Sequence, residues 1–321
     1  MIFQKTIEKM YKNIIFQRCD DNGDVFYFSA KDFDSLSAEP FSFTSSKNYK
    51  LQGYFYSYEG YDKDRLVIFD HGFGGGHLAY MTEIEALCRH GYRVFSYDHT
   101  GCMESEGEGA GGLSQSLIDL SDAISAIKAD GRYSSLDISV IGHSWGGISC
   151  LNISALHPEV SHIVAIAAPV SVKAFVEQNF SGILKGYRKC VYELERASNP
   201  KYIELDGAST LKNSSASILL IYSDNDPIVK KEYHYAPLEE ALKDKENVKL
   251  LLVSGKGHNP HYTLDALTYM GEFFRERKRL QKKKALKTRE DKDRFLALYD
   301  WRRMTAQDDE VFKVIFEVLD K

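Results

Sequence analysis

The sequence has few of the features that mark a membrane, secreted or metal-binding protein. It contains no run of about 18 apolar residues, so it predicts no transmembrane helix. Its N-terminus has no apolar stretch followed by a small-residue cleavage site, and we therefore expect no signal peptide. The five cysteines are odd in number and widely spaced, with no C-x-x-C pair. This spacing argues against a disulfide framework or a cysteine metal site and favours reduced thiols in a cytoplasm.

The sequence also lacks a strong excess of either charge, because its net charge is only −5. Such a balance argues against a nucleic-acid-binding surface over the whole chain. Residues 275–294 are locally rich in Lys and Arg and could touch anionic lipid or nucleic acid. Because Glu276, Glu290, Asp291 and Asp293 interrupt this run, a solvated outer helix face is the better interpretation. We expect no nucleic-acid partner and no integral membrane association.

Apolar runs that alternate with helix-like stretches predict the fold. Residues 1–60 form a lead-in with a hairpin, built from strand-like segments 41–43 and 51–56. Short apolar runs then follow at 66–69, 92–97, 138–141, 163–166, 218–222 and 248–253. This rhythm predicts an α/β fold with a mostly parallel, doubly wound sheet, covered on both faces and extended by an antiparallel N-terminal edge.

Two segments depart from this rhythm. Residues 171–215 separate two strands by far more than one crossover helix needs, and we interpret them as a helical lid at the carboxyl edge of the sheet. A structural excursion that covers a sheet edge is the alternative. Residues 285–321 form a C-terminal helical extension that packs on the domain or on a second subunit, which allows a homodimer. Residues 1–170 and 216–284 would then form the core.

The clearest chemical motif is Gly142-His143-Ser144-Trp145-Gly146, which matches Gly-x-Ser-x-Gly. A strand-like run enters the motif and a helix-like stretch leaves it. This is the context in which a sharp turn exposes a nucleophilic serine at the top of a sheet. The short pattern is common by chance, but its strand-to-helix setting and the additional Gly147 make chance a poor explanation.

A serine nucleophile needs a base, and the base needs an acid that orients it. In enzymes with this turn, the acid and then the histidine follow the serine along the chain. Asp224 and Asp226 follow the strand-like run 218–222, and His258 follows the run 248–253. We assign His258 as the general base and Asp226 as its partner, with Asp224 as the rival acid. An N-cap aspartate and a loop histidine are the structural alternatives.

The oxyanion hole of such a site consists of two backbone N–H groups. Trp145, directly after the serine, would supply one, and Phe73 in the glycine-rich loop 71–76 would supply the other. That loop fits neither the dinucleotide nor the P-loop phosphate pattern. No cofactor and no metal are implied, and the expected partner is a small-molecule acyl substrate.

Four segments together resemble the α/β-hydrolase superfamily, in particular its serine esterases, lipases and S33-type aminopeptidases with a helical cap. His71-Gly72 looks like the start of the family's oxyanion loop, and 98–107 looks like its D-x-R-G-x-G-x-S-x-G loop, with Thr100 for Arg and Met103 for Gly. Residues 223–229 resemble G-x-x-D-x-I-V, which favours Asp226, and 255–258 resemble G-x-G-H. The resemblance covers about residues 50–280 and implies Ser144, Asp226 and His258 as the triad.

These residues predict acyl transfer to water, with a carboxylic ester as the preferred substrate. An S33-like aminopeptidase or amidase is the alternative, since Glu177, Glu193, Glu195 or Glu204 in the lid could anchor a charged amino terminus. A protein of another class, a hydrolase-like binding protein without turnover, would lack a triad member, and none is missing here.

Overall fold

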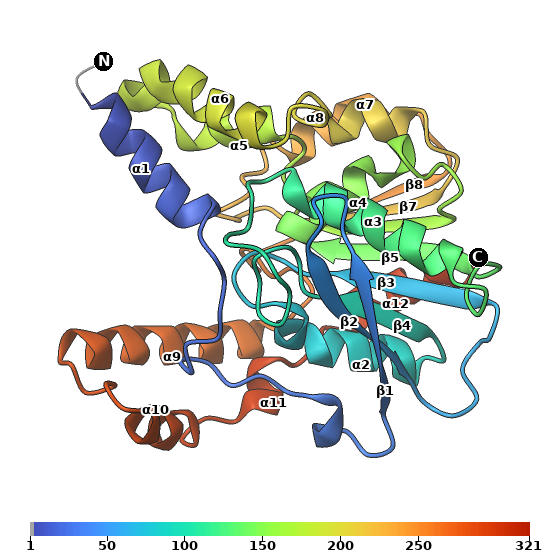
Figure 1. Cartoon of the computed structure of the whole chain (residues 1–321), viewed down its shortest axis with the longest axis horizontal. Coiled ribbons are helices and arrows are strands. Elements are labelled where there is room, and N and C mark those ends of the chain that lie inside the picture. Colours follow the sequence, from blue (N-terminus) through green and yellow to red (C-terminus); the bar gives the residue numbers. More distant parts are fainter. Residues whose placement is uncertain (1–2) are drawn as a thin grey trace.

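An eight-stranded sheet forms the centre of the computed structural model, which describes residues 3–321 (Figure 1). Met1 and Ile2, where the predicted lead-in begins, lie outside the described residues. The strands are β1 (Ser37–Thr44), β2 (Lys50–Ser57), β3 (Arg65–Asp70), β4 (Arg93–Tyr97), β5 (Asp137–His143), β6 (His162–Ile166), β7 (Ser217–Ser223) and β8 (Val248–Val253).

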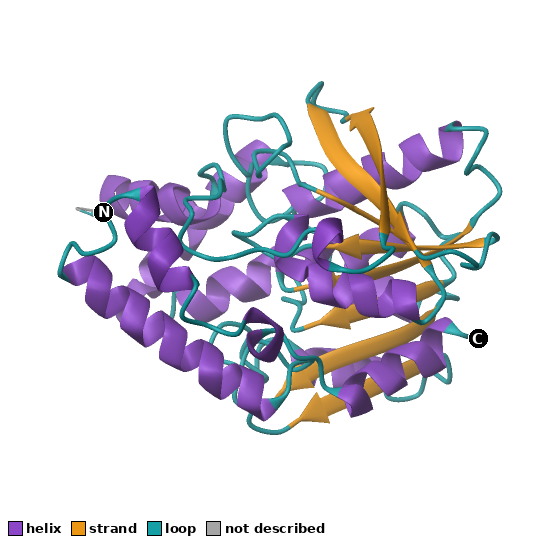
Figure 2. Cartoon of the chain, turned by 90° about the horizontal axis from the view of Figure 1, so that it is seen from below, coloured by secondary structure: helices purple, strands orange, loops and turns teal. Residues whose placement is uncertain are grey.

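The strand order in space is β1-β2-β4-β3-β5-β6-β7-β8. β1 and β2 form an antiparallel hairpin, and β2 pairs antiparallel with β4. All other neighbours are parallel. The strands rotate progressively from one edge of the sheet to the other, as strand twist requires (Figure 2). The predicted mostly parallel α/β sheet with an antiparallel N-terminal edge is confirmed.

Alternation along the buried strands divides the core into two layers. In β3, Leu66 and Ile68 point to one face of the sheet, whereas Val67 and Phe69 point to the other. The first face is covered by α3 (Gln115–Ala129), α4 (Trp145–Asn152), α7 (Gly207–Lys212) and α8 (Tyr235–Leu242). The second is covered by α2 (Met81–Arg89) and α12 (Asp309–Leu319). Both faces are apolar, which explains why these strands read as nearly continuous hydrophobic runs.

The C-terminal segment contributes directly to this core. Val311, Ile315 and Val318 of α12 are buried in the second layer, and α12 contacts β6 and β7. The preceding helices α10 (Arg289–Leu296) and α11 (Trp301–Met304) pack instead beside α9 (Leu264–Lys282), in a separate cluster around Phe273. The apolar residues of the tail thus pack back on the same chain.

The long segment between β6 and β7 leaves the sheet, and its two ends pair with each other where it begins and returns. Ser171 and Asp206 form an antiparallel bridge there, and Gly207 N–H donates to Val170 O at 2.8 Å. Between them lie α5 (Val172–Asn179), a short 3₁₀ helix (Gly182–Tyr187) and α6 (Arg188–Ser198). α7, which falls within the predicted lid range, packs on α4 and α8. The division of the chain into core, lid and extension stays a prediction.

The N-terminal helix α1 (Gln4–Ile15) extends this excursion rather than the sheet. It lies beside α6, far from β1 (Figure 1). Its Tyr11 and Ile15 are buried in a cluster with Val191 of α6. Two segments that are about 170 residues apart in sequence, α1 and α5–α6, thus pack together outside the sheet.

The remaining short 3₁₀ helices are Ala30–Asp32, His77–Tyr80 and Ile153–Ala155. No helix within residues 3–321 has both the length and the apolar character that a membrane crossing requires. The cytoplasmic location stays a prediction.

Candidate active site

Ser144 occupies a strained turn between β5 and α4. Its φ of 55° lies in the left-handed region, which non-glycine residues rarely adopt. A Cβ on Gly146 would lie 2.0 Å from Asp70 O, and one on Gly142 would lie 2.3 Å from Gly146 O. Only glycine fits at both positions, because the first turn of α4 contacts the end of β3 directly. The turn is thus imposed by backbone packing, and it leaves Ser144 partly exposed.

The three residues predicted to form a triad meet at the carboxyl edge of the sheet. Ser144 Oγ lies 2.8 Å from His258 Nε2, and His258 Nδ1 lies 2.8 Å from Asp226 Oδ2. Asp226 Oδ1 accepts the N–H groups of Ile228 and Val229 at 2.7 and 3.0 Å. These backbone bonds fix the carboxylate, so that its other oxygen faces the imidazole.

Asp224, the rival acid, has a different partner. Its two oxygens accept Ser254 Oγ–H at 2.8 Å and Gly255 N–H at 2.9 Å. The Gly255 N–H bond, followed by that from Ser254, lowers the pKa of the Asp224 carboxyl. Asp224 therefore ties the loop after β7 to the loop that carries His258, and Asp226 is the carboxylate that contacts His258.

Two backbone N–H groups are available beside Ser144. Trp145 is the first residue of α4, and neither its N–H nor that of Phe73 has an acceptor among the described residues. The Phe73 and Trp145 rings pack at 4.9 Å between centroids, which holds the glycine-rich loop against the start of α4. The positive end of the α4 dipole adds to the attraction for negative charge at this point.

A hydrogen-bond relay connects the oxyanion loop to the histidine loop. Gly72 N–H donates to the Tyr80 hydroxyl at 3.0 Å, and this hydroxyl donates to His143 Nδ1 at 2.8 Å. His143 Nε2 then donates to His258 O at 2.8 Å, since a carbonyl can only accept. Burial lowers the pKa of His143 well below its usual value and keeps the ring neutral, as this relay requires.

Sequence reasoning missed both Tyr80 and His143. The position of His143, between Gly142 and Ser144 in the motif, was the one available signal. Nothing in the sequence connected Tyr80 to either loop.

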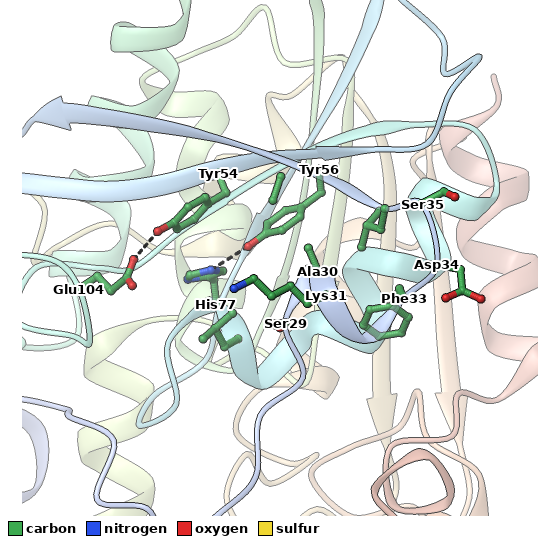
Figure 3. Close-up of a pocket in the computed structure, with 13 residues that line it drawn as sticks. Ser29, Ala30, Lys31, Phe33, Asp34, Ser35, Tyr54, Tyr56, His77 and Glu104 are labelled. Carbon is green, nitrogen blue, oxygen red and sulfur yellow. Dashed lines mark hydrogen bonds between the residues drawn. The ribbon is translucent and has the colours of Figure 1, made fainter.

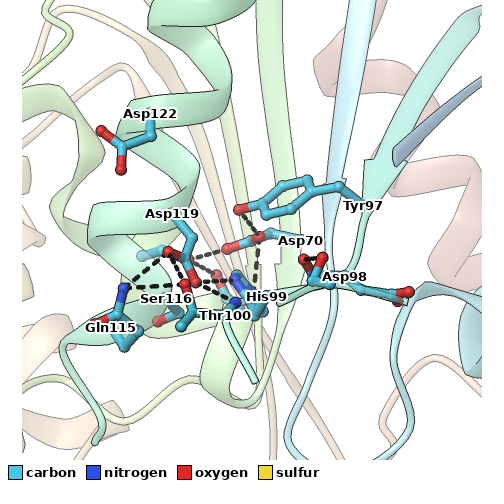
Figure 4. Close-up of polar contacts among 12 residues, drawn as sticks. Asp70, Tyr97, Asp98, His99, Thr100, Gln115, Ser116, Asp119 and Asp122 are labelled. Carbon is cyan, nitrogen blue, oxygen red and sulfur yellow. Dashed lines mark hydrogen bonds and ion pairs between the residues drawn. The ribbon is translucent and has the colours of Figure 1, made fainter. Parts of the chain in front are cut away.

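A buried charge network lies beneath the turn (Figure 4). His99 Nε2 lies 3.1 Å from Asp70 Oδ1, and its Nδ1 lies 3.4 Å from Asp119 Oδ2, with the ring fully enclosed. Neither contact has the angle of a hydrogen bond, so both are ion pairs. Burial alone would lower the pKa of His99, but Asp70 and Asp119 outweigh it and raise the pKa to about 10.

This network supports the residues around Ser144. Asp70 also accepts the Tyr97 hydroxyl at 2.8 Å and the hydroxyl of Ser149 in α4. Asp119 accepts the N–H and the hydroxyl of Thr100, each at 2.8 Å. In the resembling loop pattern an arginine stands at position 100, and here His99 supplies the positive charge next to Asp119.

The predicted lid contacts the site through a further buried carboxylate. Glu195 of α6 is fully buried and accepts the Tyr11 hydroxyl at 2.7 Å and Leu113 N–H at 2.8 Å. Leu113 O accepts the indole N–H of Trp145 at 2.8 Å. Burial raises the pKa of Glu195 to about 7, although both donors act in the opposite direction. Glu195 thus links α1 and α6 to Leu113, whose carbonyl contacts Trp145.

A separate open groove of about 830 Å³ lies between the β1–β2 hairpin and residues 29–36 (Figure 3). None of the predicted site residues lines it. Four of its polar side chains are already paired, with one another or with the neighbouring Asp98: the Tyr54 hydroxyl donates to Glu104 at 2.7 Å, and His77 bridges Tyr56 and Asp98 at 2.9 and 2.8 Å. Within residues 3–321 no group of three or more His, Cys, Asp or Glu side chains is arranged to hold a metal ion.

Glu195→Gln tests the raised pKa. Because the folded pKa of about 7 exceeds the ordinary 4.5, this group stabilises the fold fully below pH 4.5, and that stability is lost as the pH rises through 7. The free energy of unfolding of the variant relative to wild type should therefore increase over this window, by about 3 kcal/mol at most. Urea unfolding between pH 4.5 and 8 measures it, with exposed Glu193→Gln as control. A difference that does not change with pH would contradict the assignment.

The comparisons with known proteins agree with this architecture. Residues 61–204, which include Ser144 but neither Asp226 nor His258, match the serine aminopeptidase family S33. An esterase of Pyrococcus furiosus is 22% identical, with 81% of this chain and 98% of that chain covered at a TM-score of 0.60. Est1E of Butyrivibrio proteoclasticus, solved with ferulic acid, is 17% identical over 74% and 98% of the two chains, with a TM-score of 0.55.

A third solved structure, the alpha/beta hydrolase GrgF from Penicillium sp. sh18, is 18% identical, covers 82% of this chain and 100% of its own, and has a TM-score of 0.52. At these identities the likeness concerns the fold. Together with the strand order and the turn at Ser144, it shows that the chain has the fold of the α/β hydrolases.

Proposed function

We propose that the protein is a serine hydrolase that cleaves carboxylic esters through an acyl-enzyme. The observation that carries this proposal is the unbroken chain from Ser144 Oγ through His258 to Asp226, with 2.8 Å at each step. A nucleophile, a base within hydrogen-bond reach and an acid that orients the base are what serine catalysis needs.

In the first step, His258 takes the Ser144 proton while Ser144 Oγ attacks the ester carbonyl. Asp226 accepts from Nδ1–H, which leaves Nε2 free to act as the base, and it stabilises the imidazolium that forms. His258 then donates this proton to the leaving alcohol. In the second step, water attacks the acyl-enzyme with His258 again as the base, and the acid is released.

Negative charge develops on the carbonyl oxygen in both steps. The free N–H groups of Phe73 and Trp145 would receive it, and one such donor contributes about 2.7–4 kcal/mol to transition-state stabilisation. The Tyr80–His143 relay has a positioning role here, because it links the loop of Phe73 to the backbone of His258.

Apolar groups near Ser144 favour an ester with an apolar acyl chain. Phe73 and Trp145 belong to the same cluster as Phe175 and Phe180 of the lid. Such a surface gains from burying hydrocarbon and offers little to a charged terminus. The Pyrococcus furiosus protein named above is an esterase, which supports an ester substrate, although its identity to this chain is only 22%.

An S33-like aminopeptidase is the second candidate, and it depends on Glu177 as the anchor for the amino terminus of a substrate. Glu195 is buried and already bonded, while Glu193 and Glu204 pair with Arg196 at 3.3 and 2.7 Å. Glu177 is partly exposed and forms no ion pair within residues 3–321, so it is the remaining lid carboxylate that could anchor an amino terminus. A binding protein without turnover would not need the complete triad.

The proposed binding partner is a small-molecule acyl substrate. The homodimer, the absence of nucleic-acid partners and the cytoplasmic location stay predictions.

A panel of substrates tests the proposed activity. We expect hydrolysis of short and medium p-nitrophenyl esters, with kcat reduced by about 10⁴-fold or more in Ser144→Ala, because the nucleophile is lost. Asp226→Asn should lose far more turnover than Asp224→Asn, which leaves the triad intact. Faster turnover of aminoacyl amides than of esters, together with a loss of amidase activity in Glu177→Gln, would favour the aminopeptidase instead.

Tyr80→Phe tests the positioning relay. Removing the hydroxyl leaves Gly72 N–H without its acceptor and His143 Nδ1 without its donor. Because the hydroxyl does not belong to the triad, we expect kcat for the best ester to fall about tenfold, or about 1.4 kcal/mol, with KM nearly constant. Tyr54→Phe, which removes an exposed hydroxyl bonded to Glu104, is the matched control. An unchanged kcat in Tyr80→Phe would remove the relay from the mechanism.

A further inference from the structure

Cys19 and Cys102 face each other across a short parallel β-bridge. Cys19 lies in the segment that connects α1 to the rest of the chain, and Cys102 lies in the loop after β4. Cys19 N–H donates to Gly101 O at 2.9 Å, and Met103 N–H donates to Cys19 O at 2.8 Å. These two bonds flank Cys102 on both sides and make it the direct partner of Cys19.

This pairing meets the geometric needs of a disulfide. Neighbouring strands lie about 4.7–4.9 Å apart, which falls within the range of about 4.4–6.8 Å between the Cα atoms of a disulfide. Directly paired residues point their side chains to the same side of the bridge, and both cysteines belong to one buried cluster. Each thiol shifts the pKa of the other, that of Cys19 downward and that of Cys102 upward. The pairing thus brings the two cysteines within the Cα range of a disulfide.

The surrounding bonds hold the two segments in register. The Arg18 guanidinium donates to Met103 O, Ser105 O and Gly107 O at 2.6, 2.9 and 2.8 Å. On the other side, Ala110 N–H donates to Gln17 O at 3.3 Å. A Cβ on Gly109 would lie 2.0 Å from Phe16 O, so the two chains are in direct contact. Residues 16–19 are thereby fastened along the loop after β4.

The two thiols differ in character. The Cys102 thiol, and then the backbone of Gly74, lower the pKa of the Cys19 thiol in spite of its burial. The Cys19 thiol and burial raise the pKa of Cys102. Cys19 is also the less enclosed of the two, with 8% of its surface exposed against none for Cys102. The thiolate is the reactive form of cysteine, so Cys19 has the properties of the attacking residue and Cys102 those of the resolving one.

We propose that Cys19 and Cys102 form a redox-active dithiol, which a hydroperoxide oxidises to an intramolecular disulfide. The Cys19 thiolate attacks the O–O bond and takes up one oxygen as a sulfenic acid, while the other oxygen leaves as water or an alcohol. The Cys102 sulfur then attacks the Cys19 sulfur, and the sulfenic oxygen leaves as water. Two thiols lose two hydrogens and two electrons, and the hydroperoxide is reduced by two electrons.

The disulfide would act on two parts of the proposed catalytic site. It joins the segment after α1, and through α1 the lid, covalently to the loop that begins at Asp98 and His99. It also converts the Cys19 thiol, whose pKa is lowered by the backbone of Gly74, into a disulfide next to the proposed oxyanion residue Phe73. A thiol-dependent change in turnover is therefore expected, but formation of the bond itself does not depend on the proposed hydrolase function.

Peptide mapping of the full-length protein tests this proposal. The reduced protein is treated with equimolar hydrogen peroxide, alkylated and digested with trypsin without reductant. Cys19 and Cys102 fall in different tryptic peptides, 19–31 and 94–128. We expect these two peptides to be recovered joined, with the mass of two hydrogens lost, and to separate on addition of dithiothreitol. Recovery of the two as separate peptides, whether alkylated or carrying added oxygen, would overturn the proposal.

Serine variants provide the controls. Cys190→Ser removes the most exposed of the five thiols and should leave the joined peptides unchanged. Cys19→Ser and Cys102→Ser should each abolish the loss of mass, and the peroxide-induced rise in Tm that a new cross-link produces should be absent from both. A cross-link that survives in either variant, or that disappears in Cys190→Ser, would show that a different pair reacts. The wild-type peptide map remains decisive if one variant does not fold.

Discussion

The φ of 55° at Ser144 holds the proposed nucleophile in place, and the surrounding elements are arranged to maintain it. A left-handed serine costs roughly 1–3 kcal/mol and persists only where packing leaves no alternative. Here β3 supplies that packing, because Asp70 O and the first turn of α4 are too close for any side chain at Gly146. Since parallel strands end at one edge of the sheet, the loops after β7 and β8 bring Asp226 and His258 to the same point.

Polar groups below the turn oppose its relaxation. The buried His99 is positively charged between Asp70 and Asp119, whereas burial lowers the pKa of the adjacent His71 to about 3 and keeps that ring neutral. Two histidines in ring contact thus hold opposite protonation states near neutral pH. Buried ion pairs add little net stability but favour one arrangement over others. We infer that this network selects the geometry at the end of β3, on which Ser144 depends.

Much of this architecture could be predicted from local sequence. The alternating apolar runs gave the order of strands and helices, and the candidate triad residues each follow a strand, so one rule about parallel sheets brings them together. The choice of Asp226 over Asp224 rested on resemblance. Its physical cause is visible only in the structure: two backbone N–H groups fix the Asp226 carboxylate, whereas the Asp224 carboxylate is occupied by a contact with the loop after β8.

Contacts between distant segments could not be predicted in this way. Tyr11 and Glu195 are 184 residues apart, and neither helix pattern indicates its partner, so α1 was placed with the lead-in and not beside the lid. The same holds for the Tyr80–His143 relay. It also holds for α12, because its apolar sequence pattern did not distinguish packing on a second subunit from the packing on the sheet that the structure has. The excursion between β6 and β7, which we predict to be a lid, is the part that depends most on such contacts.

Covalent capture of the serine tests the central claim most directly. A fluorophosphonate probe reacts with a serine only when a base activates it and N–H donors receive the charge on its oxygen. The account predicts a single adduct per folded chain, in the tryptic peptide 133–173 that contains Ser144, and none in Ser144→Ala. A folded wild-type protein that stays unlabelled, or labelling that persists in Ser144→Ala, would contradict it.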